Sequence, residues 1–385
     1  MTVGTSSSSQ HPERQPPLKQ KMALGLKSLI GSARRFATGE EPSTVPDMAS
    51  LFPPTDPAVD GADCIHDCES CHVSYPRGFK IETDDLLYGH VKGWSTHVIV
   101  ATGKSDWVRD VEDEKGSVME AFGKATNPTN GRLMLSASNI PTPSHTSDYS
   151  EPTTAILLPA FTLIENITPA AVPRLISEYI NHAPTSKSPL EPVTLPRTLP
   201  LPGLSDAQQL LARPCPHRAV ILLCSHKTRD ARCGQSAPIL AKELERHLRP
   251  LGLFRGLDDE RPGGVGVYFI NHVGGHKYSA NMMVYRRQDA FGVDAVERGK
   301  LAPGEEVQIK KAAPKKKTDD SSEAKTDDDE EQEEDVGAAQ CIWLARVRPE
   351  DCENIVRYTV LQGKVVKPDS QLRGGFDRAK GLMSW

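Results

Sequence analysis

The chain has 385 residues, 37% of them hydrophobic, and its 46 Lys and Arg against 51 Asp and Glu give a formal net charge of −5. Residues 318–335 hold eleven acidic residues and one lysine, whereas residues 1–39 hold six basic residues and one glutamate, so the rest of the chain is neutral. A neutral body does not support nucleic-acid binding, and no apolar run approaches the ~18 residues of a membrane span, so we expect neither class of protein.

The N-terminal residues 1–60 are rich in Ser, Pro and Gln, and they are predicted to form a disordered basic leader. Within them, residues 22–36 (MALGLKSLIGSARRF) combine helical apolar spacing with three basic residues. This pattern is compatible with a mitochondrial presequence or with a basic tail that forms a nascent helix. Eight cysteines are too few for a secreted disulfide scaffold of this length, which favours a reducing compartment. We expect a cytoplasmic protein, with the mitochondrion as the alternative.

Residues 61–183 have the pattern of a first α/β module. Apolar runs predict strands at 96–103, 132–138 and 155–164, and helical spacing predicts helices at 114–125 and 168–182. The second helix is expected to begin with Thr168 as N-cap and Pro169 in its first turn. Residues 184–210 contain six prolines and are predicted to be a semi-rigid linker.

Residues 211–385 form a second predicted module. Strands are expected at 219–224, 266–271, 281–287 and 341–347, and helices at 236–249 and 349–360. The polar insert at 302–337, which includes the acidic run, is predicted to be a disordered surface loop between the last two strands.

The two modules are alike in pattern. Residues 97–122 align without gaps with residues 219–244, matching strand, polar loop and helix. Both modules then end with a strand and a helix, which is the β-α-β-β-α order of thioredoxin-like units. The predicted fold is therefore an α/β protein made of two thioredoxin-like modules. Cys224 and Cys233 align with Thr102 and Val111, so the first module is expected to lack the chemistry of the second.

Two loops of the second module carry the candidate ligands. Cys224 and Cys233 bound the segment CSHKTRDARC, and His272 and His276 lie in NHVGGHKYSAN. Both loops follow strands, and open α/β sheets place their sites at the carboxyl ends of strands. Two thiols and two imidazoles from neighbouring loops are ligands that a metal or an iron-sulfur centre needs.

Neighbouring residues are suited to support such a centre. Gly274 and Gly275 permit the positive φ angles that would turn both histidines toward one point. Cys233 precedes a predicted helix, whose N-terminal N–H groups stabilise a thiolate, and Arg229 and Arg232 add positive charge. A zinc site would use the same four ligands, although C-x8-C is not a finger spacing. A thiol-disulfide oxidoreductase would also suit the fold, but the loop lacks an adjacent C-x-x-C pair.

The chain resembles the sucrase/ferredoxin-like family over most of residues 61–385. The resemblance is carried by CSHKTRDARCG, INHVGGHKYSANMMVYRR and IWLARV in the second module and by HVIVATGKSDW in the first. The resemblance implies a thioredoxin-like ferredoxin domain whose cofactor is a 2Fe-2S cluster held by Cys224, Cys233, His272 and His276, unlike a Rieske centre in fold and motif. It implies one-electron transfer or redox sensing, an unidentified reductase as electron donor, and a carrier rather than an enzyme. The rival hypothesis is an interaction protein that a cluster or zinc stabilises.

Three further features stay open at this stage. Cys64, Cys68 and Cys71 form C-x3-C-x2-C, which indicates either a second metal or redox site or an accessible cysteine cluster. The segment with Lys104, Asp106 and Trp107 is interpreted either as a docking surface for an electron donor or as a capped loop. The ending LMSW resembles the C-terminal tripeptide of cytosolic iron-sulfur client proteins, which implies that a targeting complex recognises Trp385; alternatively, Trp385 packs against the fold.

Overall fold

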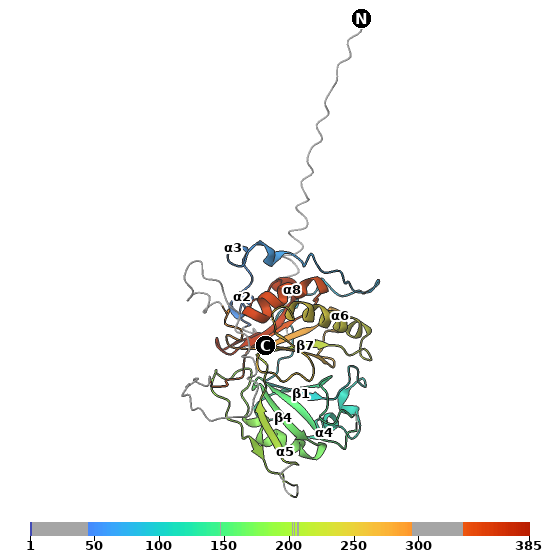
Figure 1. The fold of residues 1–385 in the computed structure, drawn as a ribbon, viewed down its shortest axis with the longest axis vertical. Coiled ribbons are helices and arrows are strands. Elements are labelled where there is room, and N and C mark those ends of the chain that lie inside the picture. The colour runs from blue at the N-terminus through green and yellow to red at the C-terminus, as the bar shows by residue number, and fades with distance from the viewer. Residues whose placement is uncertain (2–44, 147, 202, 204, 206–207, 295–333) are drawn as a thin grey trace, which may run out of the picture. The chain divides into compact units, whose positions relative to one another are not determined.

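The computed structural model describes Met1 and residues 45–385, apart from 147, 202, 204, 206–207 and 295–333 (Figure 1). The presequence-like segment at 22–36, the leader as far as residue 44 and most of the acidic insert lie outside the described residues. Residues 45–60, which were predicted to belong to the disordered leader, contain the helices α2 (Met48–Leu51) and α3 (Pro57–Asp60). Leu51 and Phe52 are fully buried, so this segment is part of the hydrophobic core.

The first half of the molecule is built from six strands and two helices that follow apolar runs of the sequence. Its elements are β1 (Thr96–Ala101), α4 (Val118–Lys124), β2 (Leu133–Ser138), β3 (Thr153–Leu158), β4 (Thr162–Ile167), α5 (Val172–Glu178), β5 (Thr198–Leu199) and β6 (Leu210–Pro214), with short 3-10 turns at Ala62–Ile65, Val111–Asp113, Pro169–Ala171 and Ile180–His182. The side chain of Ser117 caps α4 by accepting a hydrogen bond from the backbone N–H of Glu120.

The second half follows the same plan with longer helices. Its elements are β7 (Ala219–Cys224), α6 (Ala231–Leu248), β8 (Phe254–Arg255), β9 (Val265–Ile270), β10 (Met282–Arg287), β11 (Ala338–Leu344), α8 (Cys352–Asn354), which continues as a π-helix (Ile355–Val360), α9 (Pro368–Gln371), β12 (Leu372–Asp377) and β13 (Leu382–Met383), with 3-10 turns at His276–Tyr278 and Pro349–Asp351. The apolar residues of α6 recur at helical spacing, so one side of this helix is buried against the sheet.

All thirteen strands belong to one mixed sheet. The order β2-β1-β3-β4 in the first half has the same strand directions as β9-β7-β10-β11 in the second, with β1/β2 and β7/β9 parallel and the other pairs antiparallel. The α/β class is confirmed, and this repeated order is compatible with two thioredoxin-like modules. β6 and β5 extend the edge beside β4, although β5 lies in the predicted linker and β6 mostly in the predicted second module.

The two half-sheets meet where β2 pairs with β9 in antiparallel direction. The side chain of Asn139 accepts a hydrogen bond from the N–H of Phe269 at 2.7 Å, and that of Asn271 accepts one from the N–H of Ala137 at 3.0 Å. Each half thus supplies one asparagine, directly after its strand, to the strand of the other half. The junction therefore has local twofold pseudosymmetry.

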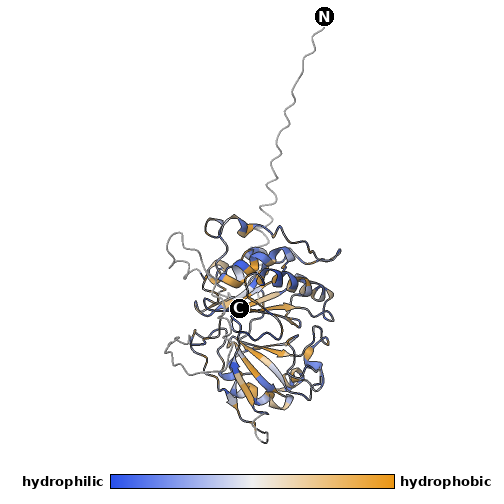
Figure 2. Ribbon diagram, viewed as in Figure 1, coloured by the Kyte–Doolittle hydropathy of each residue, from blue (hydrophilic) through white to orange (hydrophobic). Residues whose placement is uncertain are grey.

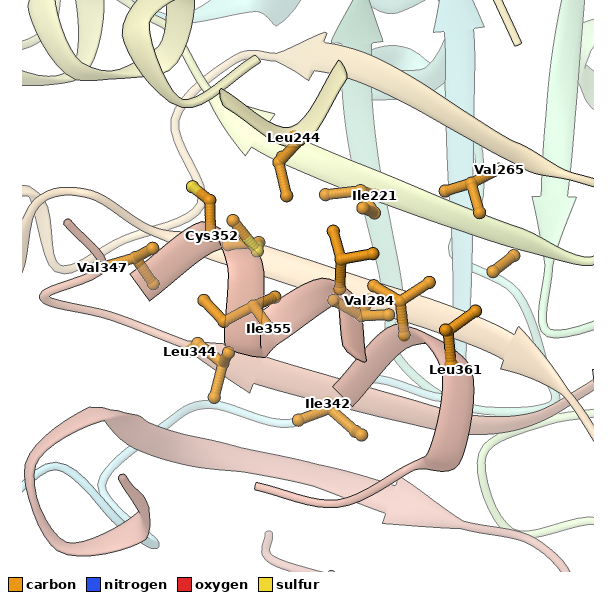
Figure 3. Packing of buried hydrophobic residues seen from close by; sticks show 14 of the residues in the cluster. Ile221, Leu244, Val265, Val284, Ile342, Leu344, Val347, Cys352, Ile355 and Leu361 are labelled. Atoms are coloured by element: carbon orange, nitrogen blue, oxygen red, sulfur yellow. The ribbon is translucent and has the colours of Figure 1, made fainter. Parts of the chain in front are cut away.

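The described chain from residue 45 onward is layered as helices, strands, strands and helices. Figure 1 shows α6 and α8 on one side, α4 and α5 on the other, and the strands of the two halves between them. Ile221 and Leu223 of β7 face α6, whereas Val220 and Leu222 join Ile99 of β1 in a core shared by both halves. Figure 2 shows largely apolar strands and a polar outer side of α6, and Figure 3 shows Leu244 of α6 close to Ile221 in the helix-covered core.

One predicted strand was wrong. Residues 155–164 form a hairpin, because β3 ends at Leu158 and β4 begins at Thr162. Pro159 has no N–H for the ladder, and Phe161 has a positive φ of 53°, so the chain turns between them.

Candidate metal centre

The two cysteines of C-x8-C meet at the start of α6. Cys224 is the last residue of β7, and Cys233 lies in the first turn of α6 because this helix begins at Ala231, earlier than the sequence indicated. Their side chains are hydrogen-bonded to each other and only 2% and 1% exposed. The hydrogen bond lowers the pKa of Cys233 and, together with burial, raises that of Cys224. Cys233 is therefore the sulfur that carries negative charge more easily.

The two histidines lie in the loop that follows β9. Gly274 and Gly275 have φ angles of 86° and 70°, and this left-handed turn brings the rings of His272 and His276 to a centroid distance of 5.1 Å. The Nδ1 atoms of both rings are buried, and the part of the chain that the structure describes offers neither of them a hydrogen-bond partner. Because buried polar atoms are nearly always paired, two unpartnered imidazole nitrogens in one loop indicate a ligand site.

The charge state of the histidines suits ligation. Burial, followed by repulsion from His276 and Arg229, lowers the pKa of His272 to about 4, so this ring is neutral at pH 7. The Asp230 carboxylate lies 3.9 Å from Nε2 of His276, on the side of the ring opposite to the buried Nδ1. The side chain of His276 is otherwise 42% exposed, so the histidines form the outer edge of the site and the cysteines its buried side.

Hydrogen bonds tie the two ligand loops together. The backbone N–H of Val273, next to His272, is hydrogen-bonded to the sulfur of Cys224. The N–H of His272 donates to Nδ1 of His226 at 3.2 Å, and Nε2 of His226 donates to the carbonyl of Trp107 at 3.1 Å. His226 is fully buried and was not singled out in the sequence, where its position two residues after Cys224 was the available signal.

Arg373 of β12 supports the histidine loop through hydrogen bonds. Its Nη1 donates to the carbonyl of Gly274 at 3.1 Å and to the side chain of Asn281 at 2.8 Å, and Asn281 in turn donates to the carbonyl of Gly275 at 3.0 Å. Burial lowers the pKa of Arg373 to about 10, so it still carries its charge at pH 7. The guanidinium also lies 4.1 Å from the ring centroid of Trp343. Nothing in the local sequence of Arg373 indicated this role.

The loop of the first half braces the cysteine loop. Asp106 accepts hydrogen bonds from the N–H and the hydroxyl of Thr228 at 2.9 and 2.8 Å, and the carbonyl of Ser105 accepts one from the hydroxyl of Ser225 at 2.7 Å. The side chain of Lys104 donates instead to the carboxylate of Glu114, with Nζ 3.2 Å from Oε1. Asp106 therefore caps a loop, as one of the two interpretations of this segment predicted.

The two arginines near the cysteines are paired with acidic residues. Arg229 lies 2.6 Å from Asp110, and Arg232 lies 2.8 Å from Asp230. They position the loop and the first turn of α6, but they add less net positive charge to the site than the sequence indicated.

Among the described residues, the four candidates form two pairs, one of hydrogen-bonded thiols and one of imidazole nitrogens without a partner. Thiols and imidazoles are ligands that a metal or an iron-sulfur centre could use. Among the described residues, only Cys68, His247 and Glu353 bring three ligand atoms within 4.8 Å of one another, so Cys224, Cys233, His272 and His276 do not form a single-ion geometry.

The remaining residues that the sequence singled out, the three N-terminal cysteines and Trp385, differ in burial and contacts. Cys64 is fully buried, Cys68 is nearly buried beside α6, and Cys71 is half-buried, so the three thiols are not equivalent. Trp385 is not on a free tail, because it stacks on Trp94 at a centroid distance of 4.5 Å and follows β13, which pairs with β12. Among the described residues, no helix has the length and apolar character to cross a membrane.

Comparison with known proteins gives one family. The model of the family described as sucrase/ferredoxin-like matches residues 87–374. The chain is 29% identical over 252 residues to actin patches distal protein 1 of Saccharomyces cerevisiae, covering 60% of this chain and 75% of that protein. It is 24% identical over 198 residues to altered inheritance of mitochondria protein 32 of Clavispora lusitaniae, covering 51% of this chain and 50% of that protein. No solved structure matches the chain.

Proposed function

The chain belongs to the sucrase/ferredoxin-like family, and we propose from this premise that it is a 2Fe-2S redox protein ligated by Cys224, Cys233, His272 and His276. The observation that carries the proposal is the pair of buried Nδ1 atoms, which have no hydrogen-bond partner among the described residues, beside two buried thiols. When bound, such a cluster would take up and release one electron at a time. We propose electron transfer or redox sensing as the use of that electron.

The surrounding residues have separate tasks in this proposal. Cys233 lies in the first turn of α6, whose N-terminal N–H groups stabilise negative charge on its sulfur, and this sulfur is hydrogen-bonded to the hydroxyl of Ser279 at 3.3 Å. Two thiolates and two neutral imidazoles place less negative charge on the site than four thiolates, so an added electron is held more easily. A redox partner would approach from the histidine edge, since the cysteine side is buried.

The test is spectroscopic and uses the full chain. We expect anaerobically purified protein to be red-brown, with visible absorbance that one electron bleaches reversibly. The variant His276→Cys should retain the colour but have a lower midpoint potential, because a thiolate adds one negative charge. Colourless protein with stoichiometric zinc would contradict the proposal, as would a potential unaffected by His276→Cys in a variant that still holds the cluster.

A thiol-disulfide oxidoreductase is the second candidate, because the fold places the thiols of Cys224 and Cys233 within hydrogen-bonding reach of each other despite their separation in sequence. An oxidised chain two mass units lighter across these residues, with no iron, would favour it. Both unpartnered histidine nitrogens have no role in that chemistry, which is why we prefer the cluster.

We further propose that the protein is cytosolic, with the mitochondrion as the alternative location, and that a reductase is its electron donor. We also propose that the cytosolic iron-sulfur targeting complex recognises Trp385 and inserts the cluster. Recognition of Trp385 would require it to leave Trp94. Removing Trp385 should then lower iron content in cells, while the purified variant should still accept a cluster chemically reconstituted in vitro. Unchanged cellular iron content would refute this role.

A further inference from the structure

We propose that Cys68, His247 and Glu353 form a separate zinc site, at the end of α6 opposite to the candidate cluster. One ligand atom from each residue lies within 4.8 Å of the other two. A thiolate, an imidazole and a carboxylate form a donor set that suits zinc, which accepts sulfur, nitrogen and oxygen ligands together. Cys68 lies outside the segment that matches the family model, whereas His247 and Glu353 lie within it.

The three ligands come from segments far apart in the sequence. Cys68 belongs to the C-x3-C-x2-C segment, His247 to the last turn of α6, and Glu353 to α8. The sulfur of Cys68 lies 4.0 Å from Nε2 of His247. Cys68 is 9% exposed and the side chain of His247 13%, whereas that of Glu353 is 34% exposed. The site is therefore mostly buried and opens to solvent at the carboxylate.

The backbone that carries Cys68 is held in place by neighbours of Glu353. The N–H of Cys68 donates to the carbonyl of Glu350 at 3.0 Å. The side chain of Asn354 donates to the carbonyls of Asp63 and His66 at 3.1 and 2.7 Å. The cysteine is thus positioned before any ion binds, which lowers the entropic cost of binding.

The surroundings provide charge balance and access. Arg246 lies 3.5 Å from the Cys68 sulfur and 2.8 Å from Glu243, and Arg357 lies 3.8 Å from Glu353, so both arginines beside the site are paired with a carboxylate. A cavity of about 350 Å³ borders Cys68, Ser70 and Glu353. It admits an ion and leaves room for water as the fourth ligand, an open position that three protein ligands leave on tetrahedral zinc.

The ion would fasten the segment around Cys68 to the helix that carries the cluster ligand Cys233. His247 and Cys233 lie about 21 Å apart along α6, from the rise of ~1.5 Å per residue. The zinc site does not depend on the cluster, and the two sites can be tested separately by their metals.

The experiment measures zinc and iron per chain in cluster-loaded, full-length protein after dialysis with excess zinc and then against metal-free buffer. We expect one zinc per chain, at least a tenfold weaker zinc affinity in Cys68→Ser and Glu353→Gln, and unchanged iron. His72→Ala, which removes an exposed imidazole of the same segment, should retain zinc as the wild type does. With cobalt in place of zinc, the wild type should show a thiolate charge-transfer band that Cys68→Ser lacks.

Three results would overturn the inference. The first is wild-type protein without retained zinc, and the second is equal zinc affinity in Cys68→Ser, Glu353→Gln and the wild type. The third is a Cys68–Cys71 disulfide in the metal-free chain that persists when reductant and zinc are supplied. Glu353→Gln keeps the shape of a partly exposed side chain, so its result stands even where Cys68→Ser fails to fold.

Discussion

The two halves of the molecule have the same strand order, yet the four proposed cluster ligands all lie in the second half. After β7 the chain offers Cys224 and Cys233. At the corresponding positions after β1, Thr102 accepts a hydrogen bond from the indole of Trp107 at 2.9 Å and Val111 is buried in a hydrophobic core. The shared strand order therefore does not determine whether a half can bind a metal. That capacity would depend on the residues in the loop after β7 and in the first turn of α6.

The loop of the first half has a structural task instead. Through Ser105, Asp106 and Trp107 it binds the residues that follow Cys224. The difference between the halves is thus a division of labour between a loop that carries proposed ligands and a loop that holds it, and four experiments test how complete this division is.

The largest effect is expected for Cys233→Ser compared with Val111→Ala at the matching position of the first half. Cys233→Ser removes a ligand and should reduce iron per chain to less than a tenth of the wild-type value. Val111→Ala should cost about 1–2 kcal/mol of stability through lost burial while iron content stays unchanged. Iron analysis with urea unfolding checks both, and equal iron loss in the two variants would contradict the division.

The next effect concerns the histidine loop and compares two adjacent glycines. A Cβ at Gly275 would lie 2.7 Å from the Arg373 guanidinium, whereas one at Gly274 would meet nothing within 4 Å. Both positions have positive φ, so alanine costs about 1–2 kcal/mol at each. Only Gly275→Ala should also displace Arg373 and weaken cluster retention, measured as the half-life of the visible absorbance. Equal half-lives would show that Arg373 does not hold the loop.

A smaller effect on cluster retention is expected when the hydrogen bonds between Asp106 and Thr228, which connect the two halves, are removed. Asp106→Ala removes two hydrogen bonds to Thr228, which are worth about 1–2 kcal/mol at this partly exposed position. Cluster loss should become several-fold faster, and the free energy of unfolding should fall by no more than this amount. Asp110→Asn, which breaks the exposed pair with Arg229, is the matched control and should change the rate less than twofold.

The smallest effect on the metal centre at neutral pH is expected from substituting His97. Nδ1 of His97 is hydrogen-bonded to the hydroxyl of Tyr285 at 2.9 Å, which connects the two halves. Burial lowers the pKa of His97 to about 3 from 6.5. The unfolded chain therefore binds a proton that the folded chain does not, and stability is lost as pH falls from about 6.5 toward 3, by up to ~1.4 kcal/mol per pH unit. His97→Gln should reduce this slope, measured by urea unfolding between pH 7 and 4.5. An unchanged slope would contradict the assignment.

Much of the fold followed from the apolar runs, because buried parallel strands such as β7 and β9 are continuous in sequence. The proximity of the cysteine and histidine loops followed from the rule that loops at the carboxyl ends of strands meet. The supporting residues did not follow, since Arg373 reaches Gly274 across 99 residues of chain. β12 was missed because its sequence contains Gly374 and Gly375, which normally weaken a strand. Here a Cβ at Gly375 would lie 2.0 Å from the carbonyl of Cys341, so the close pairing requires glycine.

The pseudosymmetric junction at Asn139 and Asn271 has a further consequence for the way the site is maintained. In a twofold dimer of single modules, each loop would be held by its partner only above the dissociation constant. In this chain the two modules are covalently linked, so the local concentration of the bracing loop is independent of the protein concentration. The first half therefore acts as a built-in partner subunit, and the braced geometry should persist on dilution to the lowest abundance at which the protein occurs.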